Sequence, residues 1–356
     1  MVDKIKVAVL GSTGLVGQRF IQILSDHPWF EVVYVAASEA NVGRKYGDVV
    51  TWLMETPLPE NISELEIQSS RPELIPRNID IVFSALPSEV ALQIELKLAK
   101  RGFIVVSNSS PLRLEPDIPL INPEVNWDHL KLVEHQRKNR AWNGVIIKNP
   151  NCTTAILTLS LKPLLDAFGI KRVIVCTLQA VSGAGLKGVP SMLIIDNVVP
   201  FIKKEEEKVE NESKKILGKL EGNNITLAPI SISAITTRVP VLDGHLELVH
   251  VELSREAEVG DVINVMSKFK SLPQELSLPT APTKPIVIRF EEDRPQPRLD
   301  KYAEKGMSVV VGRVKRADGL GRNWIKYVVL GHNTIRGAAG IAILIAELYM
   351  KLNNLI

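Results

Sequence analysis

The fold is decided by residues 6–17, KVAVLGSTGLVG, in which an apolar run meets a helical pattern through a glycine-rich turn. Residues 6–10 predict a strand, and residues 15–25 are amphipathic at helical spacing. Gly11 allows a tight turn, and Gly14 lets the backbone approach a pyrophosphate closely. Gly17 lets the helix pack closely against the strand. An anion would rest on the free N–H groups at the helix start. Although a glycine turn without a ligand is the alternative, the strand-turn-helix context favours a dinucleotide-binding loop.

The chain up to residue 150 continues to alternate short β-branched runs with helical patterns. Such alternation indicates βαβ units and a parallel sheet, so we predict a Rossmann-type domain over residues 1–150 within an α/β fold. The further strands are expected at residues 31–36, 79–84, 103–107 and 145–148, and a helix at residues 90–100.

The pattern changes near residue 150, where longer strands appear with few crossover helices between them. This predicts an α+β domain with a mixed sheet over residues 151–333, which we expect to carry catalysis and oligomerisation. A final helix within residues 334–356 is expected to pack back on the first domain. The strands are expected at residues 172–180, 235–240, 246–253, 286–289, 308–316 and 324–330, and the helices at residues 153–167, 204–220 and 259–269.

Bulk composition excludes several classes of protein. The chain has 356 residues, 45% of them hydrophobic and 23% charged, as in ordinary globular proteins. The net charge of +3 comes from interspersed acids and bases, without the basic stripe of a nucleic-acid binder. Two cysteines cannot form a disulfide scaffold, and residues 1–6 do not begin a signal peptide, so we expect a cytoplasmic protein. The apolar stretch 337–348 carries Glu347 and is too short to span a bilayer, which predicts a soluble protein without membrane contact.

The end of the second predicted strand, Ala36-Ala37-Ser38, indicates which dinucleotide is bound. NAD-specific loops place an acid about here to hold the ribose 2′-hydroxyl. A hydroxyl at Ser38 would instead donate to a 2′-phosphate, with Lys45 or Arg44 as the countercharge. We therefore predict NADP, although Glu39 could supply the acid if the strand ends one residue later.

Residues 149–154, NPNCTT, place a cysteine where a strand gives way to an apolar helix. Asn151 can cap that helix, and the first-turn position of Cys152 favours its thiolate. The first-turn N–H groups and the Asn151 amide could hold an oxyanion. The alternative is a buried structural thiol, which is how we interpret Cys176, inside a continuous strand.

A cysteine nucleophile needs a proton shuttle, and His245 stands out among six histidines. It follows the turn Asp243-Gly244 and lies seven residues after Arg238, so a strand end could present both side chains to one pocket. His27, His129 and His135 are predicted at the surface, whereas His250 lies in mid-strand and His332 near the final helix. The charge run Glu205 to Lys208 is most simply the solvated first turn of a helix, and no cluster with metal-ligand spacing occurs.

Taken together, several segments resemble the aspartate-β-semialdehyde dehydrogenase family, in particular its archaeal and fungal branch. The similarity runs through nearly the whole chain, and the order and spacing of the short motifs are specific. The segments are residues 11–17, 107–113, 149–153, 179–183, 238–245 and 333–338.

The resemblance implies roles at matching positions. Cys152 would be the nucleophile, with Asn151 beside it, and His245 the acid/base. Gln179 would orient the acyl intermediate, and Arg238 would pair with the substrate α-carboxylate. Arg113 with Asn108 would hold the phosphate, and Lys208 would also contact it. Glu205 would contact the α-amino group. Residues expected at the dinucleotide are Gly11, Ser12, Thr13, Gly14, Leu15, Val16, Ser38, Lys45, Ser84, Ala85, Leu86, Ser182, Gly183 and Asn333.

The implied activity is the NADPH-dependent conversion of β-aspartyl phosphate to aspartate β-semialdehyde, in lysine, threonine and methionine biosynthesis. The implied assembly is a homodimer or homotetramer, and no metal is needed. Malonyl-CoA reductase is the nearest rival, because the same cysteine chemistry on this scaffold needs no phosphate pocket. N-acetylglutamyl-phosphate reductase fits residues 238–245 less well, and a non-catalytic dinucleotide-binding regulator would not need Cys152, Gln179, Arg238 and His245 together.

Overall fold

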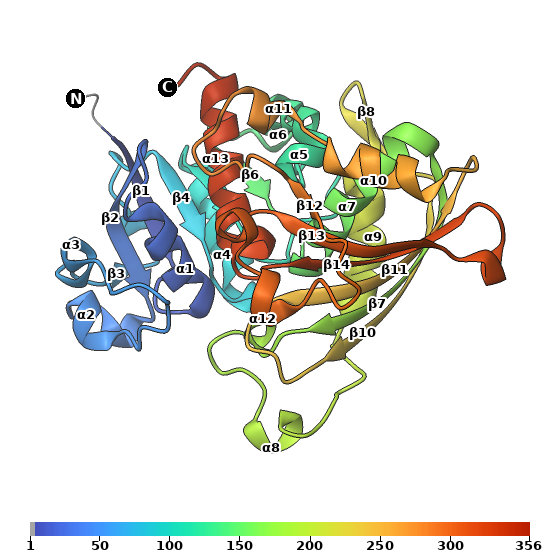
Figure 1. The fold of residues 1–356 in the computed structure, drawn as a ribbon. Helices are drawn as coiled ribbons and strands as arrows, with labels where there is room; N and C mark the ends of the chain where they lie inside the picture. Colours follow the sequence, from blue (N-terminus) through green and yellow to red (C-terminus); the bar gives the residue numbers. More distant parts are fainter. Residues whose placement is uncertain (1–3) are drawn as a thin grey trace.

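The computed structural model describes residues 4–356, in which two six-stranded sheets lie side by side, each with helices against it (Figure 1). Residues 1–3, part of the stretch at which we expect no signal peptide, lie outside the described residues. Across residues 4–356, every helix falls short of the length and apolar character that a membrane crossing requires.

The first sheet has the strand order β3-β2-β1-β4-β5-β6, and all of its strands are parallel. Its strands are β1 (Ile5–Leu10), β2 (Phe30–Ala37), β3 (Gln68–Ser69), β4 (Ile81–Ser84), β5 (Ile104–Ser107) and β6 (Val145–Lys148). The helices of this part are α1 (Leu15–Leu24), α2 (Tyr46–Val49), α3 (Glu60–Ser63), α4 (Ser88–Lys100), α5 (Pro123–Asn126) and α6 (Leu132–Arg140), with 3-10 turns η1 (Glu39–Asn41), η2 (Pro72–Leu74) and η3 (Trp127–Lys131). Each predicted strand of this region is present, with its ends within two residues of the prediction.

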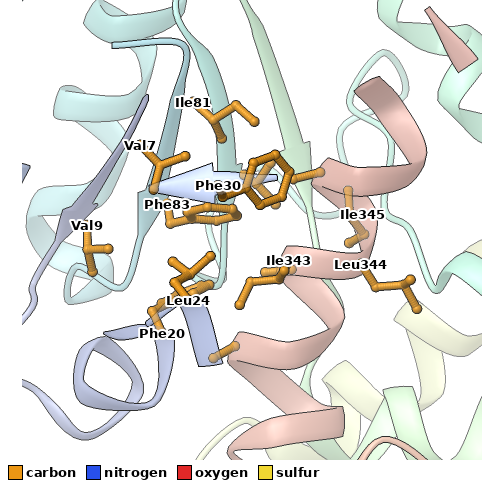
Figure 2. Close-up of a cluster of buried hydrophobic side chains, with 14 of the residues drawn as sticks. Val7, Val9, Phe20, Leu24, Phe30, Ile81, Phe83, Ile343, Leu344 and Ile345 are labelled. Atoms are coloured by element: carbon orange, nitrogen blue, oxygen red, sulfur yellow. The ribbon is translucent and has the colours of Figure 1, made fainter. Parts of the chain in front are cut away.

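The C-terminal helix α13 (Gly340–Leu352) completes the core of the first sheet. Apolar residues from β1, β2 and β4 meet Phe20 of α1 and Ile343 of α13 in one buried cluster (Figure 2). Glu347 is fully buried on this helix and accepts hydrogen bonds from His27 Nε2 at 2.7 Å and the Thr280 N–H at 3.1 Å. The prediction that His27 lies at the surface is therefore wrong, because the ring packs between this carboxylate and Phe30.

His129 is also buried, contrary to the prediction, since only 1% of its surface is exposed. Its Nδ1 lies 2.9 Å from Asn126 Nδ2 in the η3 turn. His135, on α6, is half-buried, so it is less exposed than predicted. The amphipathic pattern did not reveal the partner that holds His129 inside.

The second sheet has the order β10-β7-β11-β14-β13-β12 and is mixed, as predicted. Its central pairs are antiparallel, whereas β10 runs parallel to β7 and β12 parallel to β13. The parallel first sheet and the mixed second sheet confirm the predicted fold class. The strands are β7 (Ile170–Gln179), β10 (Ser231–Arg238), β11 (His245–Leu253), β12 (Ile286–Ile288), β13 (Val309–Arg316) and β14 (Trp324–Gly331), with the separate pair β8 (Lys219–Glu221) and β9 (Asn224–Thr226).

One face of the second sheet is covered by α7 (Cys152–Phe168), α9 (Glu205–Ile216) and α10 (Val259–Ser267), which share a single apolar core with the strands. On the other face, Ile174, Ile235 and Leu248 are exposed. Cys176 lies in register with Ile235 and Leu248 on this outer face and is half-buried, so the prediction of a buried thiol is wrong. The remaining elements are α8 (Ser191–Ile194), α11 (Leu272–Glu275), α12 (Pro297–Asp300), η4 (Val181–Ala184), η5 (Ala303–Gly306), η6 (Asp318–Leu320) and the π-helical turn η7 (Ile335–Ala339).

Candidate active site

The glycine turn between β1 and α1 has the shape that a dinucleotide loop needs. Gly11 has φ +75°, and a Cβ there would lie 2.6 Å from the Ala85 carbonyl oxygen. A Cβ at Gly17 would lie 2.2 Å from the Gly11 oxygen, so helix and turn touch at this point. Gly14 caps α1 without a side-chain acceptor, and the first turn of the helix holds no acid. The N–H groups at this helix start therefore face no competing negative side chain and fit an anion.

The end of β2 carries the groups predicted to select the dinucleotide. Ser38 is exposed, and its hydroxyl accepts from Asn41 Nδ2 at 3.2 Å. Lys45 forms an exposed ion pair with Glu64 at 2.6 Å, so its charge is paired with this carboxylate and not with Ser38. Glu39 accepts the Ser69 hydroxyl at 2.5 Å and lies 3.4 Å from Arg71, a cation that the sequence interpretation did not name.

Cys152 begins α7, and Asn151 caps that helix as predicted. The Asn151 Oδ1 accepts the N–H groups of Thr153 at 3.0 Å and Thr154 at 3.2 Å. Its Nδ2 donates to Glu205 Oε1 at 2.8 Å. These contacts engage the Asn151 amide and the N–H groups of Thr153 and Thr154, which are among the donors that the sequence predicts for an oxyanion.

The thiol of Cys152 faces His245, with Sγ 3.2 Å from Nε2. The Ala180 N–H donates to the ring Nδ1 at 3.1 Å, which assigns the proton of a neutral ring to Nε2, toward the sulfur. Burial holds the pKa of His245 well below its usual range, with Arg238 and His332 acting in the same direction. The ring is therefore neutral at pH 7 and directs an N–H donor at the sulfur.

The helix start alone does not make Cys152 a thiolate. The pKa of the Cys152 thiol is raised to about 12, mainly by burial and in part by Glu205, although Arg238 and Arg113 act in the opposite direction. The expected thiolate therefore does not form at neutral pH from the helix position alone, because desolvation outweighs the favourable helix terminus.

Arg238, at the end of β10, approaches the nucleophile from the second sheet. It is buried, and its Nη1 donates to the Ala180 carbonyl at 2.7 Å. A Cβ on Gly183 would lie 2.6 Å from Arg238 Nη1 and 3.2 Å from His245 Cε1, so only glycine lets this loop lie so close. Gln179, in register with Arg238, turns its Nε2 to Thr177 Oγ1 at 3.2 Å.

A cavity of about 450 Å³ connects the nucleophile with the predicted phosphate anchors. Arg113 donates from Nη2 to the Asn108 carbonyl at 2.7 Å, which brings the two predicted anchors together. Arg113 Nε and Asn108 Nδ2 are buried donors that have no partner within residues 4–356. Predicted residues that line this cavity are Val16, Ala85, Leu86, Asn108, Arg113, Asn151, Cys152, Ser182, Gly183, Lys208 and Asn333.

Helix α9 corrects the interpretation of the charge run at residues 205–208 as a solvated turn. Glu205 is only 6% exposed and contacts Asn151, whereas Lys208 lines the cavity 3.4 Å from Glu205. The same buried face holds Glu212, which the sequence interpretation missed. Its signal was available, because positions 205, 208 and 212 recur at the spacing of one helix face.

A second missed group lies at the carboxyl ends of β5 and β6. Lys148 and Glu95 are fully buried and form an ion pair that also binds the hydroxyls of Ser107 and Ser109. Burial lowers the pKa of Lys148 to about 8, although Glu95 opposes the shift. This polar network fixes the carboxyl ends of β5 and β6, from which the loops carrying Arg113 and Cys152 emerge.

The larger cavity, of about 780 Å³, lies between α1 and residues 279–283 and 302–307, away from Cys152. Near it, ligand atoms of Glu55, Asp243 and His332 fall within 4.8 Å of one another. Arg19 pairs with Glu55 at 2.6 Å and Lys301 lies 4.0 Å from Asp243, so both carboxylates already have cationic partners. This arrangement is an ion-pair network between the two sheets and not a favourable cation site.

Two family models match the chain in sequence order. "Semialdehyde dehydrogenase, NAD binding domain" matches residues 6–133, and "Semialdehyde dehydrogenase, dimerisation domain" matches residues 161–336. The fold and these matches define a dinucleotide-dependent oxidoreductase. The chain belongs to the semialdehyde dehydrogenase family.

Full-length relatives support the predicted resemblance. An aspartate-semialdehyde dehydrogenase of Methanothermobacter thermautotrophicus is 51% identical, with 97% of this chain and 98% of the relative covered. The crystal structure of the Candida albicans aspartate-semialdehyde dehydrogenase with NADP superposes with a TM-score of 0.90 at 40% identity, covering 99% of this chain and 100% of that one. The malonyl-CoA reductase (NADP) of Metallosphaera sedula is 38% identical, with 98% and 97% covered. The resemblance to the archaeal and fungal aspartate-semialdehyde dehydrogenases is thus confirmed. The malonyl-CoA reductase has a lower sequence identity to this chain than the Methanothermobacter enzyme.

Proposed function

We propose that the chain is an NADPH-dependent aspartate-semialdehyde dehydrogenase that reduces β-aspartyl phosphate through a thioester on Cys152. The observation that carries this proposal is the pair of unpartnered donors, Arg113 Nε and Asn108 Nδ2, beside the cavity that also contains Cys152. Buried donors without an acceptor are costly, and an anionic phosphate would satisfy both. A CoA thioester would leave no phosphate group at this position.

In the first step, the Cys152 sulfur attacks the acyl carbon of β-aspartyl phosphate, and the bond to the phosphate oxygen breaks. The leaving phosphate can carry the thiol proton, because phosphate binds a proton near neutral pH. His245 Nε2–H, 3.2 Å from the sulfur, donates to it while its negative charge develops. The ring cannot take the thiol proton without losing the Ala180 hydrogen bond, since that N–H already occupies Nδ1.

NADPH, when bound at the β1–α1 turn, supplies the hydride that reduces the thioester. Hydride addition leaves a negative charge on the oxygen of the thiohemiacetal, and as the acid/base group His245 would stabilise that oxygen through its Nε2–H. When the carbonyl re-forms, the electron pair of the C–S bond returns to the sulfur, which takes a proton from solvent. Cleavage of that bond releases the aldehyde and restores Cys152. Arg238 would hold the substrate α-carboxylate, Glu205 the α-amino group, and Gln179 the acyl oxygen. In the opposite direction, free phosphate releases the acyl group from the cysteine.

The dinucleotide site supports NADP over NAD. Ser38 offers a hydroxyl where an acid would repel a 2′-phosphate, and Glu39 is already bonded to Ser69. Arg71 and Lys45 lie near this strand end as cations that a 2′-phosphate can recruit.

Two domains would carry these functions. Residues 1–150, joined by residues 334–356, would bind the dinucleotide, and residues 151–333 would form the catalytic domain.

The enzyme would act in the cytoplasm as a homodimer or homotetramer. The exposed apolar face of the second sheet, with Ile174, Ile235 and Leu248, is the surface that self-association would cover. The matched dimerisation model spans these strands. Two unpaired cysteines, Cys152 and Cys176, suit a reducing compartment.

The experiment that tests the proposed function measures oxidation of aspartate semialdehyde by NADP as inorganic phosphate is varied. We expect strict dependence on phosphate, and we expect Arg113→Ala to raise the KM for phosphate about tenfold or more, because a charge-assisted contact is lost. NAD in place of NADP should lower catalytic efficiency. If the wild-type enzyme releases the acyl group to CoA and ignores phosphate, the thioester reductase replaces this proposal.

A further inference from the structure

Glu212 is a buried carboxylate on α9 that none of the roles above uses. It is only 2% exposed and lies seven residues after Glu205, two turns along the same helix face. A carboxylate is rarely buried unless it is paired or hydrogen-bonded. Its partners therefore indicate why it is retained inside.

Both oxygens of Glu212 bind groups that belong to the active site. Oε2 accepts the backbone N–H of Asn151 at 2.7 Å, directly before Cys152. Oε1 accepts Arg113 Nη1 at 3.0 Å, in a pair whose side chains are 7% and 3% exposed. One rigid carboxylate therefore connects the loop that carries the nucleophile with the loop that carries the anion-binding arginine.

The orientation of the Arg113 guanidinium follows from this contact. Nη1 is held by Glu212 and Nη2 by the Asn108 carbonyl at 2.7 Å, so two of its three nitrogens are engaged. The remaining Nε is the buried donor without a partner in the described part of the chain. Glu212 therefore selects which edge of the guanidinium is left for a phosphate.

The attachment of this loop to α9 does not depend on Glu212. Lys215, one turn further on, donates to the backbone carbonyls of Arg113, Glu115 and Ile118 at 2.8, 2.7 and 2.8 Å. Loss of the Glu212 contacts would thus leave the loop fastened while freeing the guanidinium and the Asn151 N–H. The contact governs local geometry more than the fold.

We infer that Glu212 is a positioning residue that fixes the separation and orientation of Cys152 and Arg113 for an acyl phosphate. The inference rests on the proposed function, since it assigns Arg113 to phosphate. A displacement of about 1 Å in a reacting pair can cost about a hundredfold in rate. Glu212 also neutralises Arg113, so its removal does not weaken the attraction of the guanidinium for phosphate.

The test compares Glu212→Gln with Glu210→Gln in phosphate-dependent oxidation of aspartate semialdehyde. Glu210 is the matched control, because it lies on the same helix and accepts the Ala234 N–H at 3.0 Å, away from the cavity. A glutamine at 212 can accept from only one partner and turns its NH₂ donor toward the other. We expect kcat to fall at least tenfold with the KM for phosphate within twofold of wild type, and Glu210→Gln to match wild type.

Melting temperature and the alkylation rate of Cys152 by iodoacetamide without substrate are measured in parallel. We expect Glu212→Gln to melt close to Glu210→Gln and to change the alkylation rate at least threefold, because the glutamine amide cannot hold the Asn151 N–H and Arg113 together as the carboxylate does. If Glu212→Gln does not fold, Glu212→Asp decides on the same readouts, since it keeps the charge but reaches only one partner.

A kcat within twofold of wild type overturns the inference, and so does an effect confined to the KM for phosphate, which would make Glu212 part of the anion site. Failure of the proposed function is separate, because it shows as phosphate-independent oxidation by the wild-type enzyme. In that case the alkylation rate alone decides: a change upholds Glu212 as the group that positions the Cys152 loop, and no change overturns it.

Discussion

The two faces of the second sheet differ in chemistry although the same strands build both. On the inner face, Gln179, Arg238 and His245 are buried and hydrogen-bonded around Cys152. On the outer face, Cys176 and Ile235 lie in register and are exposed or half-buried. Because side chains alternate along a strand, each strand can present polar chemistry inward and an apolar surface outward.

This difference shows that the role of a cysteine depends on whether it lies beside the helices that cover the inner face or on the uncovered outer face. Cys152 has a ring nitrogen at 3.2 Å, a capping Asn151 and a cavity beside it. Cys176 is also half-buried, but it lies on the exposed apolar face of the sheet, next to Leu248. We therefore expect the inner face to control turnover and the outer face to control association.

The largest effect expected is the loss of turnover in Cys152→Ala, by at least about a thousandfold, since no other thiol reaches the cavity. Dinucleotide binding should stay unchanged, because Gly11 and Gly14 belong to the β1–α1 turn, whereas Cys152 begins α7. Activity is measured as NADPH formation and binding by dinucleotide fluorescence. Cys176→Ala is the matched control and should keep full activity. Residual turnover near wild type in Cys152→Ala would erase the distinction between the two faces.

Arg238→Lys should lower catalytic efficiency by roughly ten- to a hundredfold although the charge is kept. Lysine cannot hold the Ala180 carbonyl and a substrate carboxylate together, as the guanidinium fork can. Steady-state kinetics with aspartate semialdehyde measure the change. Efficiency within twofold of wild type would remove Arg238 from the inner-face chemistry.

The pH dependence of alkylation sharpens the comparison further. Burial raises the pKa of Cys152 to about 12, so the thiolate fraction should grow about tenfold per pH unit. In a Cys176→Ala background, iodoacetamide labelling of the substrate-free enzyme should keep rising from pH 6 to pH 9. The labelling is measured by mass spectrometry of the Cys152 peptide. A labelling rate that reaches a plateau below pH 8 would mean that the thiolate already forms in the resting enzyme.

The smallest effect on the fold is expected on the outer face. Ile235→Lys adds a charge to an exposed position, so the free energy of unfolding of the separated chain should change by less than about 0.5 kcal/mol. Self-association should weaken, and sedimentation velocity would report a smaller species. Ser231→Lys, at the exposed beginning of the same strand, is the matched control for an added charge and should keep the assembly. An unchanged sedimentation coefficient in Ile235→Lys would place the interface elsewhere.

Local patterns were enough to predict the longer strands and helices, but they missed the short strands β3, β8 and β9, and the helix predicted over residues 204–220 ends at Ile216, before β8. Residues 6–17 contain strand, turn and helix start within one stretch, so the dinucleotide loop depends on no distant contact. The Asn151 cap was predictable for the same reason. The meeting of Cys152, His245 and Arg238 was not, because it depends on the register of β7 with β10 and β11. The family resemblance supplied it instead.

The residues that were missed or misplaced share a physical cause. Glu212 and Glu205 look like the solvated face of a charged helix, and only their distant partners Arg113 and Asn151 show why they are inside. His27 pairs with a carboxylate 320 positions away in sequence. The spacing of residues 205, 208 and 212 places them on one helix face, but spacing alone does not show that this polar face is buried, because its partners lie far away in sequence.

The most direct test of the central claim is NADPH oxidation by the wild-type enzyme with β-aspartyl phosphate and with malonyl-CoA, measured side by side. Arg113 and Asn108 present unpartnered donors beside Cys152, so the acyl phosphate should be reduced with far higher catalytic efficiency. The phosphate released should equal the NADPH consumed. Equal or greater efficiency with malonyl-CoA would contradict the account and assign the cavity to a thioester.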